Sequence, residues 1–402
     1  MGLIVQKYGG TSVKDAERVM NVARRITETY QAGNNVVVAV SAQGDTTDDL
    51  IEKAKEINPR ASKREMDMLL STGEQISIAL LAMAIEKLGY PVISLTGWQA
   101  GMQTNSNYGN ARIKTIDTER IRMELDRRRI VIVAGFQGIN KYDDITTLGR
   151  GGSDTSAVAL AAALRADLCE IYTDVDGVYT TDPRICSKAY KLNDISYDEM
   201  LELASLGANV LHNRSVEMAK KYNVKLSVRS SLNNNEGTYV KEVSTVEKML
   251  VRGVTRDNDC ARIALCGVED APGKAFQVFE MIAKAGISVD LIIQSIGDGK
   301  TKDISFTVAE ADLESALKLL EENNDFIKAR EIKSSKDVSK VSIVGAGMVN
   351  NSGVAAKMFE ALYDAHINIK MIATSEIKIS VLVAQKDAET AVNAIHDKFL
   401  SK

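Results

Sequence analysis

The chain has 402 residues, of which 45% are hydrophobic and 26% charged, and its formal net charge is −4. This length predicts two or three domains, and the slight acidity argues against nucleic-acid binding, which favours basic surfaces. Four cysteines without a CxxC pair and only three histidines argue against a disulfide framework or a zinc site. Because no charged-then-apolar leader and no run of 18 apolar residues occur, we expect a soluble cytoplasmic protein without a membrane or nucleic-acid partner.

The first dozen residues predict a strand, a glycine turn and a helix. An apolar run ends in the sequence KYGGTS at 7–12, and an amphipathic stretch follows at 14–30. Gly9 and Gly10 permit close backbone approach, and the helix start offers N–H groups and a positive dipole end. Lys7 adds a mobile charge. These features suit a polyphosphate, but the local pattern fits an ordinary strand–helix turn equally well.

Short β-rich runs alternate with helical stretches up to about residue 230. Strands are predicted at 35–41, 91–95, 130–134, 169–173 and 226–228, and helices at 64–88 and 155–164. Strands separated by helices indicate an α/β fold with a doubly wound parallel sheet. Ligands of such sheets bind beyond the carboxyl ends of the strands.

Polar segments follow several of these strands. Residues 41–49 offer hydroxyl groups and a glycine, although alone they are more typical of a helix N-cap. Residues 147–155 carry three glycines that can wrap a small ligand. Within them Arg150 can bind a carboxylate in a bidentate manner, and Asp154 can orient a lysine or a metal ion, or simply cap the helix.

Two further candidates are weaker. Residues 172–184 contain polar and aromatic groups that suit a nucleotide's base and sugar, but a plain surface loop would be equally polar. Glu74 lies beside Gly73, which interrupts a helical stretch. It is suited to hold an ammonium group, although a solvated helix residue is the commoner case.

The chain changes character after a turn signal at 233–237. Eight residues recur at a constant offset of 80: Gly273, Ala275, Phe279, Glu280, Ala285, Ile287, Ile292 and Ser295 return as Gly353, Ala355, Phe359, Glu360, Ala365, Ile367, Ile372 and Ser375. Each copy predicts a βαββαβ order, which is a small α+β sandwich. Self-similarity at a fixed period indicates two copies of one structural unit.

The motifs KYGGTS at 7–12, GRGGSD at 149–154 and TDVDGVYTTDPR at 173–184 together resemble the aspartate kinases of the amino acid kinase family. The repeat resembles a pair of ferredoxin-like ACT domains, so the resemblance covers essentially the whole chain. It implies a kinase domain over 1–235, a linker or first ACT strand over 236–258, and ACT domains over 259–335 and 338–402. Strands of such pairs interleave, so residues 249–254 are candidates for the last unit.

The resemblance also implies the reaction, in which MgATP phosphorylates the β-carboxylate of L-aspartate to 4-phospho-L-aspartate, the first step towards lysine, threonine and methionine. Lys7, Asp154 and Arg150 would be catalytic: Lys7 would bind phosphates, Asp154 would orient Lys7, and Arg150 would bind a carboxylate. The expected ATP ligands are Lys7, Tyr8, Gly9, Gly10, Ser41, Thr173, Asp174, Tyr179, Asp182 and Arg184. The expected aspartate ligands are Thr47, Glu74, Arg150, Gly151, Gly152 and Ser153. Mg²⁺ would be held by phosphates and water, without a protein ligand.

For the ACT pair, the resemblance implies an amino-acid effector, lysine or threonine, and a homo-oligomer or an α2β2 assembly. The expected effector contacts are Asp270, Ala271, Pro272, Gly273, Lys274, Ala275, Ser288, Val289, Asp290, Gln294, Asn368, Ile369, Ser375 and Glu376. Backbone N–H groups near Gly273 would bind the effector's carboxylate, and Asp290 its ammonium. Turn chemistry and dimer packing are the alternative explanation of these residues. Met249 is in frame to start a separate regulatory subunit.

Two alternatives remain beside a feedback-regulated aspartate kinase. One is a kinase of the same fold that acts on glutamate, carbamate or UMP, against which Thr47, Glu74 and the ACT pair argue. The other is an amino-acid sensor with an inert kinase domain, against which Lys7 and Asp154 argue. A carboxylate acceptor is already deprotonated at pH 7, so phosphoryl transfer needs alignment and charge stabilisation rather than a general base.

Overall fold

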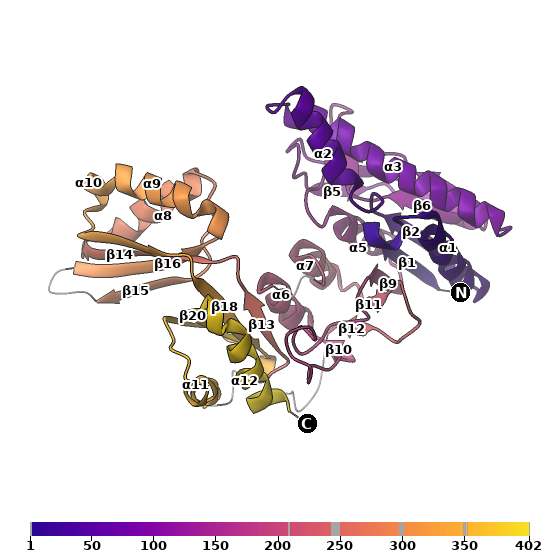
Figure 1. Ribbon diagram of the computed structural model, residues 1–402. Helices are drawn as coiled ribbons and strands as arrows, with labels where there is room; N and C mark the ends of the chain where they lie inside the picture. Colours follow the sequence, from indigo (N-terminus) through magenta and orange to yellow (C-terminus); the bar gives the residue numbers. More distant parts are fainter. Residues whose placement is uncertain are drawn as a thin grey trace. The chain divides into compact units, whose positions relative to one another are not determined.

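The computed structural model describes residues 2–207, 210–242, 250–296, 301–348, 351 and 353–401. The chain forms two compact units. The first comprises Met1–Val178, Lys191–Ser205 and Asn209–Ser244, and the second Tyr179–Tyr190, Leu206–Ala208 and Thr245–Lys402. The expected fold class, a doubly wound α/β sheet followed by two α+β units, is confirmed (Figure 1).

An eight-stranded sheet forms the centre of the first unit, in the order β10-β12-β11-β9-β1-β2-β6-β3. Its strands are β1 (Leu3–Tyr8), β2 (Asn35–Val40), β3 (Val92–Leu95), β6 (Ile130–Ala134), β9 (Leu168–Thr173), β10 (Asp194–Ile195), β11 (Leu226–Ser230) and β12 (Thr238–Val240). β1 pairs in parallel with β2 and β9, whereas β12 is antiparallel to β11. Strand β1 is therefore central, and Lys7 lies near its carboxyl end.

Helices pack on both faces of this sheet. The helices of the first unit are α1 (Ala16–Gln31), α2 (Thr46–Ile57), α3 (Lys63–Lys87), α4 (Glu119–Asp126), α5 (Gly152–Leu164), α6 (Tyr197–Ser205) and α7 (Asn213–Tyr222), of which α2 packs on α3. Ile26 of α1 and Leu81 of α3 pack against Val38 of β2 on one face. The buried, alanine-rich α5 packs on β1, β2 and β9. Lys7 is in register with Ala39 of β2, the neighbour of Val38. Because side chains alternate along a strand, Lys7 and Val38 belong to opposite faces of the sheet, and Lys7 lies on the α5 side.

Helix α3 is long and apolar enough to cross a membrane by length and composition alone. The buried helix of a protein core meets the same criteria. Here Leu81 and Ile85 are fully buried in the core beside α1. The same helix buries the carboxylates of Asp67 and Glu74, so these two charged groups are turned into the protein.

A second, small sheet of the first unit was not predicted. Its order is β5-β4-β7-β8. Its strands are β4 (Met102–Thr104), β5 (Ile113–Ile116), β7 (Gln137–Ile139) and β8 (Ile145–Thr147). Strand β8 ends two residues before Gly149, so this sheet leads directly into the glycine loop that begins α5.

The second unit contains two four-stranded sheets, in the orders β15-β16-β14-β17 and β13-β18-β20-β19. The strands are β13 (Gly253–Asp257), β14 (Ala261–Glu269), β15 (Ile292–Ile296), β16 (Thr301–Val308), β17 (Glu331–Ser335), β18 (Val338–Val344), β19 (Met371–Thr374) and β20 (Lys378–Ala384). The helices are α8 (Lys274–Lys284), α9 (Leu313–Glu322), α10 (Asn324–Ile327), α11 (Val354–Asp364) and α12 (Ala388–Leu400).

The sequence repeat is visible in this unit. Helices α8 and α11 begin and end 80 residues apart, and each is preceded by a glycine of positive φ, 90° at Gly273 and 95° at Gly353. Strand β13 precedes the first repeat in the chain but pairs with β18 of the second. Of residues 249–254, the candidates for the last unit, Gly253 and Val254 belong to β13, and Met249 lies outside the described residues.

Candidate active site

Lys7 and Asp154 form an ion pair where the central strand ends. Lys7 Nζ lies 2.7 Å from Asp154 Oδ1, and each side chain is 12% exposed. Asp154 belongs to the first turn of α5, so the pair joins the end of β1 to the start of a helix. Helix starts favour anions, and a lysine there adds positive charge. This edge of the sheet is therefore suited to a phosphorylated ligand.

The turn after β1 is packed directly against the loop that follows β2. A Cβ at Gly10 would lie 2.5 Å from the Ala42 carbonyl oxygen, so only glycine fits there. The backbone N–H of Gly44 donates to the Gly10 carbonyl at 3.1 Å, and that of Ser41 to the Tyr8 carbonyl at 3.1 Å. The expected ATP ligands 8–10 and Ser41 thus lie together. The Tyr8 ring, however, is buried and stacks on Tyr172, so only its backbone is placed to meet a ligand.

Glu74 is buried rather than solvated, so the alternative of a solvated helix residue is wrong. Its side chain is 3% exposed, and Oε1 accepts a hydrogen bond from the Ala42 N–H at 3.0 Å. Oε2 has no hydrogen-bond partner among the described residues. Burial raises the pKa of Glu74 to about 7. Thr47, in the first turn of α2, is half-buried. Glu74 thus has one buried oxygen suited to a cationic partner.

The glycine loop before α5 is shaped by close contacts. Gly151 has φ of 65°, and a Cβ there would lie 2.1 Å from Cγ of His212, a residue that the sequence analysis missed. Ser153 packs against Gly135, and Gly152 against Phe136. Arg150 is exposed. The loop therefore presents an arginine and the backbone groups of 151–153 at the start of the helix.

Replacing Gly151 with alanine is expected to displace this loop. The positive φ alone costs about 1–2 kcal/mol for a residue with a side chain, and the contact with His212 adds to it. We expect a raised KM for the acceptor substrate and a lower Tm. The double variant Gly151→Ala/His212→Ala should recover part of the Tm, because it removes the clash. A single variant with wild-type KM and Tm would show that the loop geometry is not needed.

Two expected nucleotide ligands lie at the end of the neighbouring strand β9. The Thr173 carbonyl accepts from the Ser231 N–H at 2.9 Å, and the Thr173 hydroxyl donates to Asp174 Oδ1 at 2.9 Å. Ser231 also bonds Ser12, which connects the loops after β1 and β11. Ser12 and Ser231 had not been predicted as part of the site.

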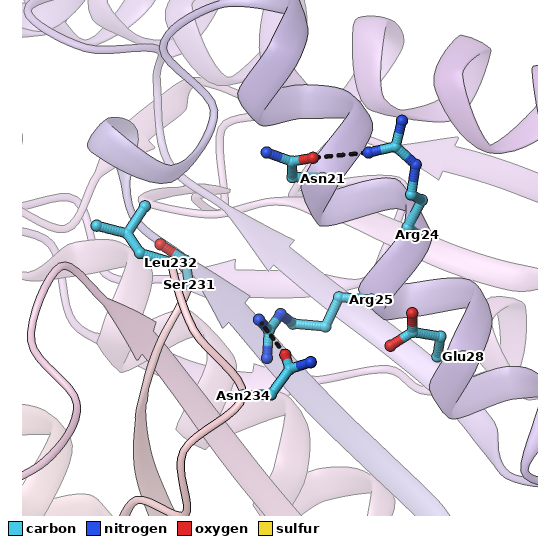
Figure 2. Close-up of a pocket in the computed structure, with 7 residues that line it drawn as sticks. All are labelled: Asn21, Arg24, Arg25, Glu28, Ser231, Leu232 and Asn234. Atoms are coloured by element: carbon cyan, nitrogen blue, oxygen red, sulfur yellow. Dashed lines mark hydrogen bonds between the residues drawn. The ribbon is translucent and has the colours of Figure 1, made fainter.

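A polar pocket of about 310 Å³ lies between α1 and the loop after β11, lined by Asn21, Arg24, Arg25, Glu28, Ser231, Leu232 and Asn234. Figure 2 shows Arg24 bonded to Asn21 and Arg25 bonded to Asn234. None of the expected site residues lines this pocket. Its arginines are engaged with neutral side chains, and Glu28 offsets part of their charge, so the pocket is not assigned to the reaction.

The remaining expected nucleotide ligands, Tyr179, Asp182 and Arg184, belong to a segment that groups with the second unit. Arg184 binds Asp182 through two nitrogens, Nε to Oδ1 at 3.0 Å and Nη2 to Oδ2 at 2.7 Å. This guanidinium holds the pKa of Asp182 below its usual range. The nucleotide role of the three residues stays a prediction.

Helix α12 holds this segment within the second unit. Thr180 Oγ1 lies 2.9 Å from Nε2 of the buried His396, and Asn393 donates to the Ile185 carbonyl at 3.1 Å. Burial lowers the pKa of His396. Lys188 and Asp397 add an exposed ion pair at 2.7 Å. The end of the second ACT-like unit therefore fixes the chain between β9 and β10.

Asp290, the expected ligand for an effector's ammonium, already contacts an ammonium group of the protein. Lys340 of β18 is 4% exposed and forms ion pairs with Asp290 and, at 3.1 Å, with Asp257. Burial alone lowers the pKa of Lys340, but the two carboxylates outweigh it and raise the pKa. Asp270 likewise pairs with Lys302 at 2.8 Å, and Lys274 donates to the Phe326 carbonyl. The effector contacts stay predictions.

No metal centre is evident in the described part of the chain, where no group of three or more His, Cys, Asp or Glu side chains is placed to hold an ion. The site combines a lysine–aspartate pair at the end of a central parallel strand with two glycine turns, and the same chain carries a duplicated α+β unit. Together these features define a kinase for a small molecule with a regulatory region. Comparisons with known proteins show which family of kinases this is.

The family model described as the amino acid kinase family matches residues 2–230, and the ACT domain model matches residues 263–323 and 341–399. The aspartokinase of Bacillus sp. (strain MGA3) is 53% identical over 400 residues, covering 99% of this chain and 97% of that protein. Aspartokinase 2 of Bacillus subtilis (strain 168) is 52% identical over 404 residues, covering 100% and 99%. The chain belongs to the amino acid kinase family, and its resemblance to the aspartate kinases is confirmed.

Solved structures agree with this assignment. E. coli aspartokinase III in complex with aspartate and ADP, described as the R-state, superimposes with a TM-score of 0.81 at 26% identity, covering 98% of this chain and 99% of that chain. The T-state of the same enzyme, in complex with lysine and aspartate, gives a TM-score of 0.79 at 26% identity, covering 99% of both chains.

Proposed function

We propose that the chain transfers the γ-phosphoryl group of MgATP to the β-carboxylate of L-aspartate, giving ADP and 4-phospho-L-aspartate. The observation that carries this proposal is the Lys7–Asp154 pair at the end of β1, in the same unit as the buried carboxylate of Glu74. Full-length relatives at 52–53% identity that bear the name aspartokinase support it, as does an E. coli homologue solved with aspartate and ADP.

The charge of each site residue determines which part of the substrates it binds. The ionised β-carboxylate is itself the nucleophile, so the protein has to align the reactants and stabilise charge. Lys7 neutralises charge on the transferred phosphoryl group, and Asp154 holds the lysine in place. Glu74 binds the substrate ammonium and Arg150 a substrate carboxylate. These contacts hold the substrate by its ammonium and by one of its carboxylates.

Mg²⁺ supplies charge neutralisation on the phosphates when it is bound with ATP. Magnesium keeps several waters and is commonly held through substrate phosphates. Asp154, the carboxylate beside Lys7, is engaged in the ion pair, so Lys7 and the start of α5 suit phosphates rather than the cation itself. The nucleotide, rather than a protein cage, therefore carries the ion.

The acceptor is tested by measuring ADP release with aspartate, glutamate, carbamate and UMP at equal concentration. Aspartate should be preferred over glutamate by about tenfold or more, since an added methylene displaces the reacting carboxylate. Equal rates with another acceptor would favour the second kinase hypothesis. No ADP release above background with any of the four acceptors would favour the inert sensor.

The ACT pair makes the enzyme responsive to an amino acid, for which lysine and threonine are the proposed effectors. The lysine complex of E. coli aspartokinase III supports lysine. An effector must bind two states of the protein with different affinity to change the rate. Assembly through the ACT domains, as a homo-oligomer or as α2β2, and a cytoplasmic location without nucleic-acid or membrane partners complete the proposal.

Titration of lysine and threonine, alone and together, should lower the rate and raise Tm, since a bound effector stabilises the state that it selects. The measurements are initial velocity at fixed aspartate and the thermal midpoint. An amino acid that is not a product of the pathway, such as alanine, serves as the control. If neither effector changes either quantity, the regulatory proposal fails while the kinase proposal stands.

A further inference from the structure

Asp67 is a fully buried carboxylate that the proposed mechanism does not use. It lies on α3 with 0% exposure. Both of its oxygens accept from the Gly109 N–H, at 3.0 and 2.9 Å. Oδ2 also accepts from the Thr147 N–H at 3.0 Å, and Oδ1 from the Thr147 hydroxyl at 2.7 Å. A buried carboxylate is costly unless hydrogen bonds satisfy it, and here they come from two separate segments, the turn at Gly109 and the end of β8.

The two segments held by Asp67, the turn at Gly109 and the end of β8, are themselves joined. The Ala111 N–H donates to the Thr147 carbonyl at 2.8 Å. Arg214 of α7 donates to the carbonyls of Leu148 at 2.8 Å and Ala111 at 2.6 Å. The segment at 147–148 is thus fixed from α3 by Asp67 and from α7 by Arg214. It leads directly into the glycine loop 149–153.

Asp67 and Glu74 are seven residues apart on α3, which is about two helical turns, so they project from the same face. Glu74 binds the loop after β2 through Ala42, whereas Asp67 binds the chain before the glycine loop. One rigid helix therefore carries the proposed ligand of the substrate ammonium and the anchor of the loop with the proposed carboxylate ligands.

We propose that Asp67 is a positioning residue that sets the spacing between Glu74 and the glycine loop 149–153, and with it the affinity for aspartate. The inference rests on the proposed function, because that function assigns the substrate ammonium to Glu74 and a substrate carboxylate to the glycine loop. Asp67 does not touch the substrate. Its effect is expected on the KM for aspartate, with the KM for ATP unchanged.

The test compares three variants with the wild-type chain. Asp67→Ala should raise the KM for aspartate by about 10- to 100-fold, since small displacements of positioning groups have effects of this size. Asp67→Asn should stay within about threefold of wild type, because its oxygen can accept from both N–H groups while its NH₂ donates to the Thr147 hydroxyl. Thr147→Val removes the hydrogen bond from the Thr147 hydroxyl, and its KM for aspartate should lie between those of Asp67→Ala and Asp67→Asn.

Glu124→Ala is the matched control. Glu124 is a second buried carboxylate of the first unit, 1% exposed, and its ion pairs in the described part of the chain are with Arg120, Arg127 and Arg129. The Glu124→Ala variant should have a lower Tm than the wild type and an unchanged KM for aspartate. An equal rise of KM in Glu124→Ala, or a wild-type KM in Asp67→Ala and Thr147→Val, would overturn the positioning role. If Asp67→Ala does not fold, Thr147→Val alone decides.

Amide hydrogen exchange tests the positioning role of Asp67 independently of the proposed function. Faster exchange at 109–111 and 147–153 in Asp67→Ala, with unchanged exchange along β1, is expected because the anchored bonds are lost. Unchanged exchange at these residues would overturn the anchor. A wild-type chain without aspartate-dependent ADP release would overturn the proposed function, whereas the exchange result would still test what Asp67 holds.

Discussion

Replacing Lys7 with alanine is expected to lower kcat by about 10²–10³-fold, the usual effect of removing one group that stabilises transition-state charge. The reason is the position of Lys7 Nζ, which lies beside Asp154 at the start of α5 with most of its side chain shielded from water. Aspartate binding should persist, because Glu74 and Arg150 are unchanged. The measurements are kcat from ADP release and the dissociation constant of aspartate from calorimetry.

Lys87→Ala is the control for this substitution, because Lys87 is exposed in the last turn of α3. Asp154→Asn should retain more activity than Lys7→Ala, because the charge of Lys7 remains and only the contact that holds it is weakened. Turnover close to wild type in Lys7→Ala, with Tm and aspartate binding intact, would contradict the charge role of Lys7.

The pH dependence of kcat/KM for aspartate should report the ionisation of Glu74. Burial raises the pKa of Glu74 to about 7, so below that pH the carboxyl is largely neutral and cannot pair with the substrate ammonium. We expect log(kcat/KM) to rise with a slope near one below about pH 7 and to level off above it. Glu74→Gln should lose this rise and bind aspartate at least about tenfold more weakly, since a charged hydrogen bond is removed.

Stability gives an independent check of the same group. Because the folded-state pKa lies above the unfolded value, the neutral carboxyl contributes stability that is fully present below about pH 4.5 and is lost as pH rises through about 7. The free energy of unfolding of the wild type, relative to Glu74→Gln, should therefore fall between pH 5 and pH 8. A constant difference across this range would show that Glu74 is not buried as described.

The sequence predicted the features that repeat or alternate. The eight matches at an offset of 80 residues gave the duplicated unit, because a whole supersecondary unit leaves many coincident positions. Lys7 and Asp154 stand in motifs rich in glycine, and the structure places them in contact. Such motifs are visible because close approach of backbones restricts which residues fit.

Other features had no local signal. The strands of the small sheet are three or four residues long, which is too short for a periodic pattern. Asp67 and Glu74 resemble solvated helix residues in the sequence, and only tertiary packing buries them. His212 and Arg214 lie about 60 to 100 residues from the segments that they contact. The grouping of 179–190 with the second unit likewise depends on α12, about 200 residues later.

The most direct test of the account traps the product. The chain is incubated with MgATP, L-aspartate and hydroxylamine, which converts an acyl phosphate into a hydroxamate, and the product is identified by mass and by comparison with authentic α- and β-hydroxamates. We predict aspartate β-hydroxamate formed in proportion to ADP, with none from Lys7→Ala above about 1% of the wild-type rate. ADP release without any aspartate hydroxamate, or formation of the α-hydroxamate, would contradict phosphorylation of the β-carboxylate.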